Sequence, residues 1–548
     1  MSTKLVYGAD ARRELVAGAK KMDKAVSVTM GPRGRLAVID DGVGIPHLTK
    51  DGVTVANAIK IDDPIQNSGA IILREAARKT AAEAGDGTTT TCVLASAIMS
   101  DGLKALELND NHAREFFEGL DESLQDVLRD IESRRLDVTD PEQIHHVATI
   151  SANGDSMLGS LLASAIEKLG PRATILIEEA RVYETTIEFV DGTEIDRGFV
   201  SPHFVNSKVS NKCRFEKPNI VVFNRRITSL KEILLLLEHA SRSNRPLLMF
   251  AEDYDSEVLK GLILNKQRGN LQVCACKLPE FGGMIHESAH DLAALFGCRP
   301  VSDADFDERG VIRITEDLLG SAEATESTRE KTTVLRPDSD QDRIVDRLLD
   351  IDEESSECTN QDRVAQLERR SRRLKSGIAI LRVGAATEVE LQEKLDRVDD
   401  ATNAIRVAAL HGILPGGGDA LLRASLILND ISKTKSGAKK AAYEVISTAI
   451  QRPFRAILEN ARYNGDVVLK QFINHNSHLT TSDDANREKE RGFNALSGQF
   501  VNLIDDGVID PYYVTKLALI NALSVAKKIL EVGCIINSGY NNFEEENV

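Results

Sequence analysis

Residues 84–95 read A-G-D-G-T-T-T-T-C-V-L-A, and the rest of the chain is organised around this stretch. Gly85 and Gly87 allow positive φ angles or a close approach of a ligand, and the threonines stand where a helix is expected to begin. The free N–H groups of a first helical turn and the helix dipole together favour anions such as phosphate. Because Asp86 would repel a bare phosphate, the pattern predicts that it binds a Mg²⁺ ion accompanying the phosphate. A glycine turn followed by threonine caps is the alternative that these residues leave open.

Composition narrows the class of protein. The chain has 548 residues, enough for several domains, with 85 acidic against 68 basic residues and a net charge of −17. We therefore expect no nucleic-acid and no membrane partner. Seven cysteines are scattered without a C-x-x-C pair, which is typical of reduced thiols. The first residues form no signal core or transit peptide and no apolar run has the length of a membrane span, so we expect a cytoplasmic protein.

Hydrophobic spacing predicts mainly helices as far as about residue 134. Residues 9–30 carry an apolar stripe with a helical period. Short strands are predicted at 38–39 and within 47–56, with a turn at Asp51-Gly52. The polar stretch 147–155 interrupts the pattern and is a candidate hinge.

The middle of the chain has a different pattern. Strand-like runs at 219–223, 246–251 and 271–277 alternate with helical patterns at 228–242 and 254–268. Such alternation predicts an α/β domain with a mainly parallel sheet.

A highly charged helical stretch follows at 338–375. Its basic cluster, Glu368–Lys375, is preceded by acidic residues, so we interpret it as a solvated helix face and not as a nucleic-acid site. A strand at 377–383 and a long helix at 387–410 are predicted next.

Eight short segments make the chain similar to a known family. In chain order they are V-T-M-G-P-R-G-R (28–35), T-K-D-G-V-T-V-A (49–56), G-D-G-T-T-T-T (85–91), T-I-S-A-N-G-D (149–155), D-R-G-F-V-S-P-H-F (196–204), V-G-A-A-T-E-V-E (383–390), G-G-G (416–418) and I-D-P (509–511). No single segment is decisive, but the ordered set resembles the group I chaperonins, the GroEL family, from residue 5 to about residue 530.

This resemblance implies a multidomain fold of α and α/β type. A mainly helical equatorial ATP-binding domain would comprise residues 1–133 and 411–525. A small α/β intermediate hinge domain would comprise 134–190 and 379–410, and an α/β apical substrate-binding domain 191–378. Residues 526–548 would form a C-terminal tail.

The resemblance also implies an ATP site with Mg²⁺ and K⁺. Asp51 and Asp400 match the acidic residues associated with hydrolysis, and Asp86 would bind Mg²⁺. Thr29, Lys50 and Thr89 resemble the family's K⁺ site. The nucleotide would be bound by Thr29, Met30, Gly31, Pro32, Lys50, Asp86, Gly87, Thr88, Thr89, Thr90, Gly417, Asn494, Ala495, Leu496 and Asp510.

Apolar residues of the middle segment match the family's surface for non-native client proteins. They are Phe199, Phe204, Leu234, Leu237, Leu259, Ile263 and Leu264. Residues at i,i+3 and i,i+4 spacing share a helix face and are usually core, but an exposed face of this kind would bind unfolded chains without reading their sequence.

The family implies an ATP-driven folding chamber. Its members form homo-oligomers, here expected as a double seven-membered ring, and use a lid-forming, GroES-like co-chaperonin. This chain departs from the family at His203, near Leu410-His411 and in lacking a Gly-Met tail. A specialised paralogue that acts as a scaffold or interaction protein, with an altered or lost folding cycle, is therefore the alternative.

A rival of another class rests on His286-Glu-Ser-Ala-His290. This is a literal H-E-x-x-H, the zincin pattern, with two imidazoles one turn apart and Glu287 as the general base of a metallopeptidase. Asp303, Asp305 and Asp307 are candidate third ligands. Under the chaperonin interpretation the same helix packs on the apical sheet and binds no zinc.

Overall fold

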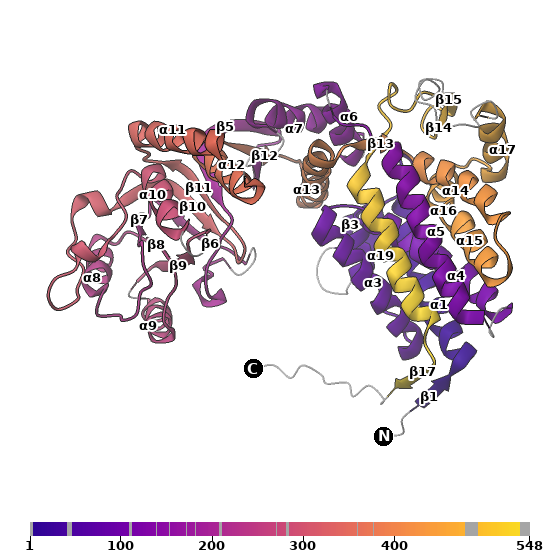
Figure 1. Ribbon diagram of the computed structural model, residues 1–548, viewed down its shortest axis with the longest axis horizontal. Coiled ribbons are helices and arrows are strands. Elements are labelled where there is room, and N and C mark those ends of the chain that lie inside the picture. Colours follow the sequence, from indigo (N-terminus) through magenta and orange to yellow (C-terminus); the bar gives the residue numbers. More distant parts are fainter. Residues whose placement is uncertain are drawn as a thin grey trace. The chain divides into compact units, whose positions relative to one another are not determined.

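The computed structural model describes residues 4–40, 46–108, 112–138, 140–152, 154–170, 173–180, 182–207, 211–269, 271–280, 284–358, 360–375, 377–476 and 491–537. The chain forms two compact units (Figure 1). The helical unit comprises Met1–Arg172, Ile177–Thr186 and Arg382–Val548, and the sheet unit Ala173–Leu176 and Ile187–Leu381. Most of the predicted equatorial and intermediate segments belong to the helical unit, and the predicted apical segment to the sheet unit. The three-domain division itself stays a prediction.

The helical unit is built around α4, whose first half is almost entirely buried. Helix α19 packs along α4 and α3 (Figure 1). Helices α1 and α3 approach closely through glycines: a Cβ on Gly18 would lie 1.8 Å from the carbonyl oxygen of Gln66, and one on Gly69 would lie 2.1 Å from that of Leu15. The helices are α1 (Gly8–Val26), α2 (Gly52–Ala58), α3 (Pro64–Ala84), α4 (Thr88–Leu108), α5 (Ala113–Ser133), α6 (Pro141–Ser151), α7 (Ser156–Leu169), α13 (Glu388–His411), α14 (Asp419–Ser432), α15 (Gly437–Ala449), α16 (Arg452–Asn460), α17 (Gly465–Asn476) and α19 (Tyr512–Leu530).

The described part of this unit also contains four small antiparallel strand pairs. They are β1 (Lys4–Tyr7) with β17 (Cys534–Asn537), β2 (Ala37–Ile39) with β3 (His47–Thr49), β13 (Ile413–Pro415) with β16 (Ile509–Pro511), and β14 (Gly492–Asn494) with β15 (Gln499–Val501). Regular structure therefore continues well beyond residue 526, where the tail was expected to begin, and the rest of that tail, 538–548, lies outside the described residues.

The predicted strand over 53–56 is wrong. Residues from Gly52 onward form α2 instead, because Asp51 caps this helix. Its carboxylate accepts hydrogen bonds from the N–H groups of Val53 (2.9 Å) and Thr54 (2.7 Å), and from the Thr54 hydroxyl (2.6 Å). Capping of this strength outweighs the strand preference of a β-branched run.

The sheet unit contains the predicted parallel strands. The nine-stranded sheet has the order β4-β12-β5-β11-β10-β7-β8-β9, and β6 pairs with β10. Strands β7, β8 and β9 are parallel, and every side chain of β7 and β8 is buried, as expected when both faces of a sheet are covered. The strands are β4 (Thr174–Glu179), β5 (Thr186–Ile195), β6 (Cys213–Glu216), β7 (Asn219–Val222), β8 (Leu247–Ala251), β9 (Val273–Lys277), β10 (Gly320–Ser327), β11 (Thr332–Pro337) and β12 (Gly377–Val383).

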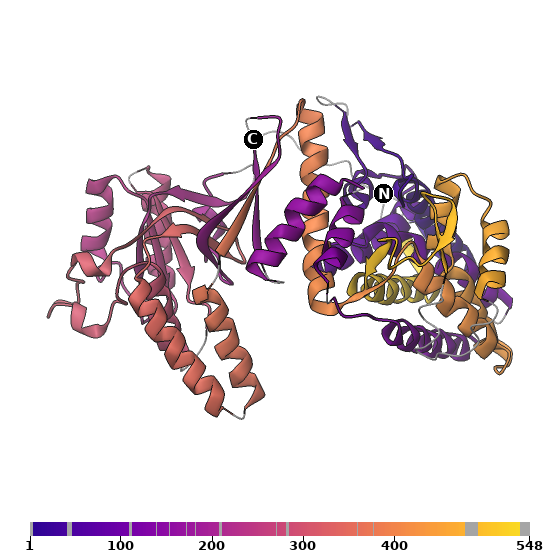
Figure 2. The ribbon, with the colours of Figure 1, turned by 90° about the horizontal axis from the view of Figure 1, so that it is seen from above.

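Among the described residues of the sheet unit, five segments form α-helices. They are α8 (Leu234–Ser243), α9 (Ser256–Gln267), α10 (Ile285–Leu295), α11 (Gln341–Glu357) and α12 (Gln361–Lys375). Helices α11 and α12 lie side by side as a hairpin (Figure 2) and both contact α10. The helix predicted at 228–242 corresponds to α8, which begins later than expected, at Leu234.

The basic cluster of α12 is only in part the solvated face that its composition indicated. The side chains of Arg370 and Arg373 are almost completely buried. Arg370 donates to both carboxylate oxygens of Asp291 on α10, and Arg347 of α11 donates to the same carboxylate (2.9 Å). Arginine can be buried in this way because its planar fork pairs with carboxylates, so the cluster holds the hairpin on α10.

Candidate functional site

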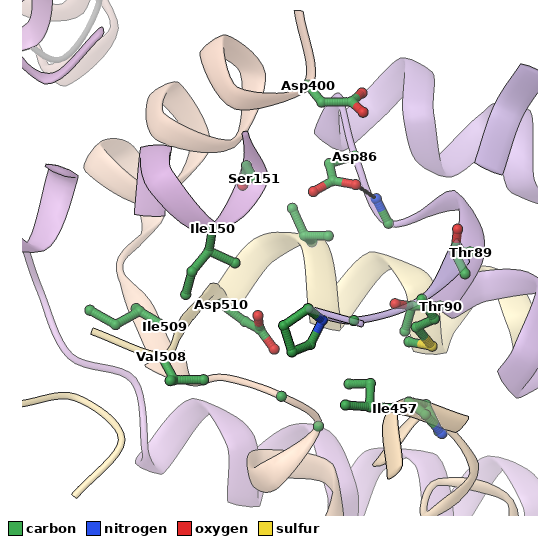
Figure 3. A pocket seen from close by; sticks show the side chains of 18 of the residues that line it. Asp86, Thr89, Thr90, Ile150, Ser151, Asp400, Ile457, Val508, Ile509 and Asp510 are labelled. Carbon is green, nitrogen blue, oxygen red and sulfur yellow. Dashed lines mark hydrogen bonds between the residues drawn. The ribbon is translucent and has the colours of Figure 1, made fainter. Parts of the chain in front are cut away.

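A cavity of about 740 Å³ opens in the helical unit (Figure 3). It is lined by every residue predicted to bind nucleotide or to act in hydrolysis. These are Thr29, Met30, Gly31, Pro32, Lys50, Asp51, Asp86, Gly87, Thr88, Thr89, Thr90, Asp400, Gly417, Asn494, Ala495, Leu496 and Asp510. Segments that lie hundreds of residues apart in the sequence therefore meet in one cavity.

The glycine loop at the start of α4 has the geometry that its sequence predicted. Gly85 ends α3 at φ 72° and Gly87 has φ 91°, both in the left-handed region. A Cβ on Gly85 would lie 2.3 Å from the Cβ of Asn403, and one on Gly87 would lie 2.7 Å from Cγ1 of Val514, so neither position has room for a side chain. Because α4 begins at Thr88, the first-turn N–H groups without helical partners lie in the lining of the cavity.

A second loop follows α1 and the short 3-10 turn Ser27–Thr29, and its residues Thr29–Pro32 line the cavity. Asn460 of α16 fixes it, because its side-chain amide donates to the carbonyl oxygens of Ser27 and Met30, each at 2.8 Å. Asn460 could not be predicted from the sequence, since nothing local to it indicates a contact with a loop more than 400 residues earlier.

The segment before α2 comes close to the threonine run of α4. A Cβ on Gly52 would lie 2.3 Å from the Thr89 hydroxyl oxygen. Thr89 and the Lys50–Gly52 segment are thus neighbours, as the resemblance required for a K⁺ site. Asp51 is engaged as the cap of α2, so in this structure its carboxylate already accepts three hydrogen bonds.

Three carboxylates, those of Asp400, Asp86 and Asp510, point into the same space (Figure 3). Burial, and then the nearby charges of Asp86 and Asp51, raise the pKa of Asp400 to about 9. Burial, followed by the charge of Asp86, raises the pKa of Asp510 to about 7. Burial also raises the pKa of Asp86, although the Gly87 N–H donates to its carboxylate. The lining thus carries more carboxylates than it can hold ionised without a cation.

This donor set fits Mg²⁺. Oxygen ligands are those that Mg²⁺ prefers, and it is commonly bound by one or two carboxylates together with phosphate oxygens. Asp86 would hold the ion, since it lies beside the N–H groups that would receive phosphate.

The far end of the cavity is apolar and suits a nucleoside. Figure 3 shows Ile150, Val508 and Ile509 on one side of the cavity and Thr89 and Thr90 on the other. Pairing of β13 with β16 places Pro415 opposite Ile509, which brings the Gly416–Gly418 loop beside Asp510. The N–H groups of Gly417 and Gly418 donate to the Asp510 carboxylate.

Several lining residues were not predicted. Ile150 and Ser151 come from α6, where the sequence indicated only a hinge, and Asp396 precedes Asp400 by one turn of α13. The spacing of Asp396 and Asp400, four residues apart on one helix, was a readable signal for Asp396.

The predicted client residues fall into two groups. Phe204, Phe199 and Leu237 are 0%, 6% and 9% exposed and belong to the core of the sheet unit, so their assignment to an exposed surface is wrong. Leu234 and Leu264 are 48% and 47% exposed. Leu259 and Ile263 are partly buried against the core. The sequence analysis missed Leu235, which is 45% exposed on α8.

The H-E-x-x-H residues lie on α10 but do not form a zincin site. Arg363 donates to both carboxylate oxygens of Glu287 (3.1 Å each) and Arg370 also donates to it, so the required general base is held in ion pairs. The candidate third ligands are engaged as well: Asp303 pairs with Arg225, Asp305 pairs with Arg299, and Asp307 accepts two backbone N–H groups of its own loop. Within the described ranges, no three His, Cys, Asp or Glu side chains are placed to hold a metal.

Residues 22–539 match the model of the TCP-1/cpn60 chaperonin family, and the chain therefore belongs to this family. Among solved structures, it is similar to the chaperonin gp146 from the bacteriophage EL 2 (Pseudomonas aeruginosa), crystallised in the presence of ATP-BeFx. The two share 24% identity over 98% of this chain and 99% of that chain, with a TM-score of 0.69. This likeness shows the shared fold, and the predicted GroEL-like fold class is confirmed. In the part of the chain that the structure describes, no helix combines the length and the apolar character needed to cross a membrane.

Proposed function

We propose that this chaperonin binds ATP with Mg²⁺ in the cavity of the helical unit, hydrolyses it, and uses the turnover to capture and enclose non-native proteins. The observation that carries the proposal is the convergence of every predicted nucleotide residue on one cavity. The presence of ATP-BeFx in crystals of the similar phage chaperonin supports nucleotide binding.

Different residues of the cavity have different roles in binding and hydrolysing ATP. The N–H groups at the start of α4 and the Thr29–Pro32 loop bind the phosphates. When bound, Mg²⁺ supplies charge neutralisation for phosphoryl transfer. Asp400, whose pKa of about 9 would fall once a cation neutralises the neighbouring carboxylates, would then orient the attacking water and accept its proton, while Asp51 keeps α2 in place as its cap. The backbone oxygens of Thr29 and Lys50, together with the Thr89 hydroxyl, would hold K⁺.

An apolar surface on α8 and α9 binds the clients. Leu234, Leu235 and Leu264 are exposed, with Leu259 and Ile263 packed on the core behind them. Leu230, just before α8, packs on α9, since a Cβ on Gly261 would lie 2.0 Å from its Cδ1. Burial of apolar surface is non-directional, which suits clients of unrelated sequence.

The family suggests the assembly and its location. We propose a homo-oligomer, as a double ring of seven subunits, that acts in the cytoplasm with a lid-forming, GroES-like co-chaperonin. All seven cysteines lie within the described residues as free thiols, which agrees with a reducing compartment.

The test is steady-state ATPase activity of the purified protein, with Mg²⁺ and K⁺ each omitted in turn, alongside capture of a chemically denatured client. We expect activity that requires Mg²⁺ and increases with K⁺, and electron microscopy should show rings. If the protein binds ATP without hydrolysing it, and binds the client equally well with and without nucleotide, the scaffold alternative would be favoured instead.

A further inference from the structure

Helix α13 brings a second carboxylate, Asp396, into the cavity one turn before Asp400. The Oδ2 atom of Asp396 accepts a hydrogen bond from the Thr49 hydroxyl (3.4 Å) and lies 3.7 Å from Nε2 of His47. Both partners belong to β3, and α13 packs on this strand. A single carboxylate thus connects the helix that carries Asp400 with the β2–β3 hairpin.

The imidazole of His47 has a ring nitrogen without a hydrogen-bond partner. Its Nε2 atom is enclosed and has no hydrogen-bond partner, and Asp396 is the carboxylate that it faces. An enclosed polar atom without a partner is unfavourable, and a closer approach of about 1 Å would give a normal hydrogen bond here. The other groups acting on Asp396 are the Gln392 amide, which donates to Oδ1 (3.4 Å), and the negative charge of Asp51.

Thr49 links this contact to the loop that lines the cavity. Its side chain is fully buried, and its hydroxyl oxygen accepts a hydrogen bond from the N–H of Asp51 (2.9 Å) while the hydroxyl donates to Asp396. The position of α13 and that of the Lys50–Gly52 segment are therefore coupled through one side chain.

We propose that His47 and Asp396 are positioning residues, which hold α13 on the β2–β3 hairpin and so keep Asp400 in place for hydrolysis. The proposal rests on the proposed ATPase function. One helical turn separates Asp396 from Asp400, so a shift of the first displaces the second. A displacement of about 1 Å at a reacting group can cost about a hundredfold in rate, and partial loosening of the helix should cost less.

The test compares three variants with the intact protein. His47→Leu removes the ring nitrogen, Asp396→Ala removes the carboxylate, and His47→Gln keeps an N–H donor of similar reach. We expect the first two to lower kcat for ATP about tenfold, with KM within about twofold and with unchanged thermal unfolding. His47→Gln should restore most of the rate, and the double variant should be no slower than the slower single variant.

Hydrogen exchange without nucleotide gives a second readout. His47→Leu and Asp396→Ala should both increase exchange of the backbone amides over 388–400 and 47–49, because each releases α13 from the hairpin. Val38→Ala is the matched control, since Val38 is an exposed residue of β2 that does not take part in the contact. It should leave both readouts unchanged.

Some results would overturn the proposal. One is that both single variants keep the wild-type kcat and the wild-type rate of hydrogen exchange. The others are that kcat of His47→Gln is no higher than that of His47→Leu, or that the losses in rate add in the double variant. A wild-type protein that turns over no ATP would contradict the proposed function, and the exchange result would then decide on the contact by itself.

Discussion

Asp23 should destabilise the folded protein at neutral pH. It lies on α1, and its Oδ1 atom is enclosed without a hydrogen-bond partner. Burial raises its pKa from 3.8 to about 6, although a hydrogen bond from Ser96 and the charge of Arg452 oppose this shift. At about 1.36 kcal/mol per pKa unit, a shift of about two units corresponds to roughly 3 kcal/mol of unfavourable free energy once the group is ionised.

The sign of the pH dependence follows from the direction of the shift. Because the folded state holds the proton more tightly, the cost is fully present above pH 6 and is lost as the pH falls from about 6 toward 3.8. Asp23→Asn removes this titration, so we expect the variant to be more stable than the wild type by roughly 1–3 kcal/mol at pH 7–8, the lower value allowing for the lost attraction to Arg452. The gain should shrink steadily toward pH 5.

Urea unfolding followed by circular dichroism at pH 8, 7, 6 and 5, at one protein concentration, measures this gain as a shift in midpoint. Asp10→Asn is the matched control, because Asp10 is exposed on the same helix and forms a surface ion pair with Arg13. It should change the midpoint little at any pH. An Asp23→Asn midpoint equal to or below that of the wild type at pH 8, or a gain that does not shrink by pH 5, would refute the reasoning.

Two further predictions concern the proposed function. Asp400→Ala should retain ATP binding by calorimetry but lose about a hundredfold or more in turnover, the scale of a general base, and unchanged turnover would remove Asp400 from the chemistry. Leu264→Ser should abolish capture of a denatured client with ATPase activity intact, whereas Val345→Ser, at a 53% exposed apolar residue of α11, should not. Equal capture by both variants would place the client surface elsewhere.

Local patterns predicted those parts of the site that depend on backbone shape. The glycines around Asp86 allowed positive φ angles and the threonines suited a helix start, and the structure has both at the beginning of α4. Alternating apolar runs likewise predicted the parallel strands β7, β8 and β9. The meeting of distant segments in one cavity could not be derived in this way. It was expected only because the ordered set of segments resembled a family.

Burial was the weakest part of the prediction, because spacing along a helix or loop does not tell which neighbours cover a side chain. Phe199 and Phe204 are apolar residues in a suitable pattern, but the core encloses them. Arg370 belongs to a basic cluster whose composition predicted a solvated helix face, but Asp291 and Glu287 of a different helix, α10, pair with it. In both cases the deciding partner is distant in sequence.

Distant partners also decide the outcome for the H-E-x-x-H pattern. Its spacing matches that of a metallopeptidase, but the residues around it do not leave Glu287 free to act as a base. A general base needs a free carboxylate facing an open position, whereas two arginines of α12 hold Glu287 and join it to the buried ion pair of Arg370 with Asp291. The carboxylates of the cavity in the helical unit are in the opposite situation. Burial and mutual repulsion raise the pKa values of Asp400, Asp86 and Asp510, and among the residues that the structure describes none of these three forms an ion pair. Negative charge that the fold leaves uncompensated is what a metal cation can neutralise, so the contrast in pairing, and not the motif, separates the carboxylates of the ion-pair network from those proposed to act on the nucleotide.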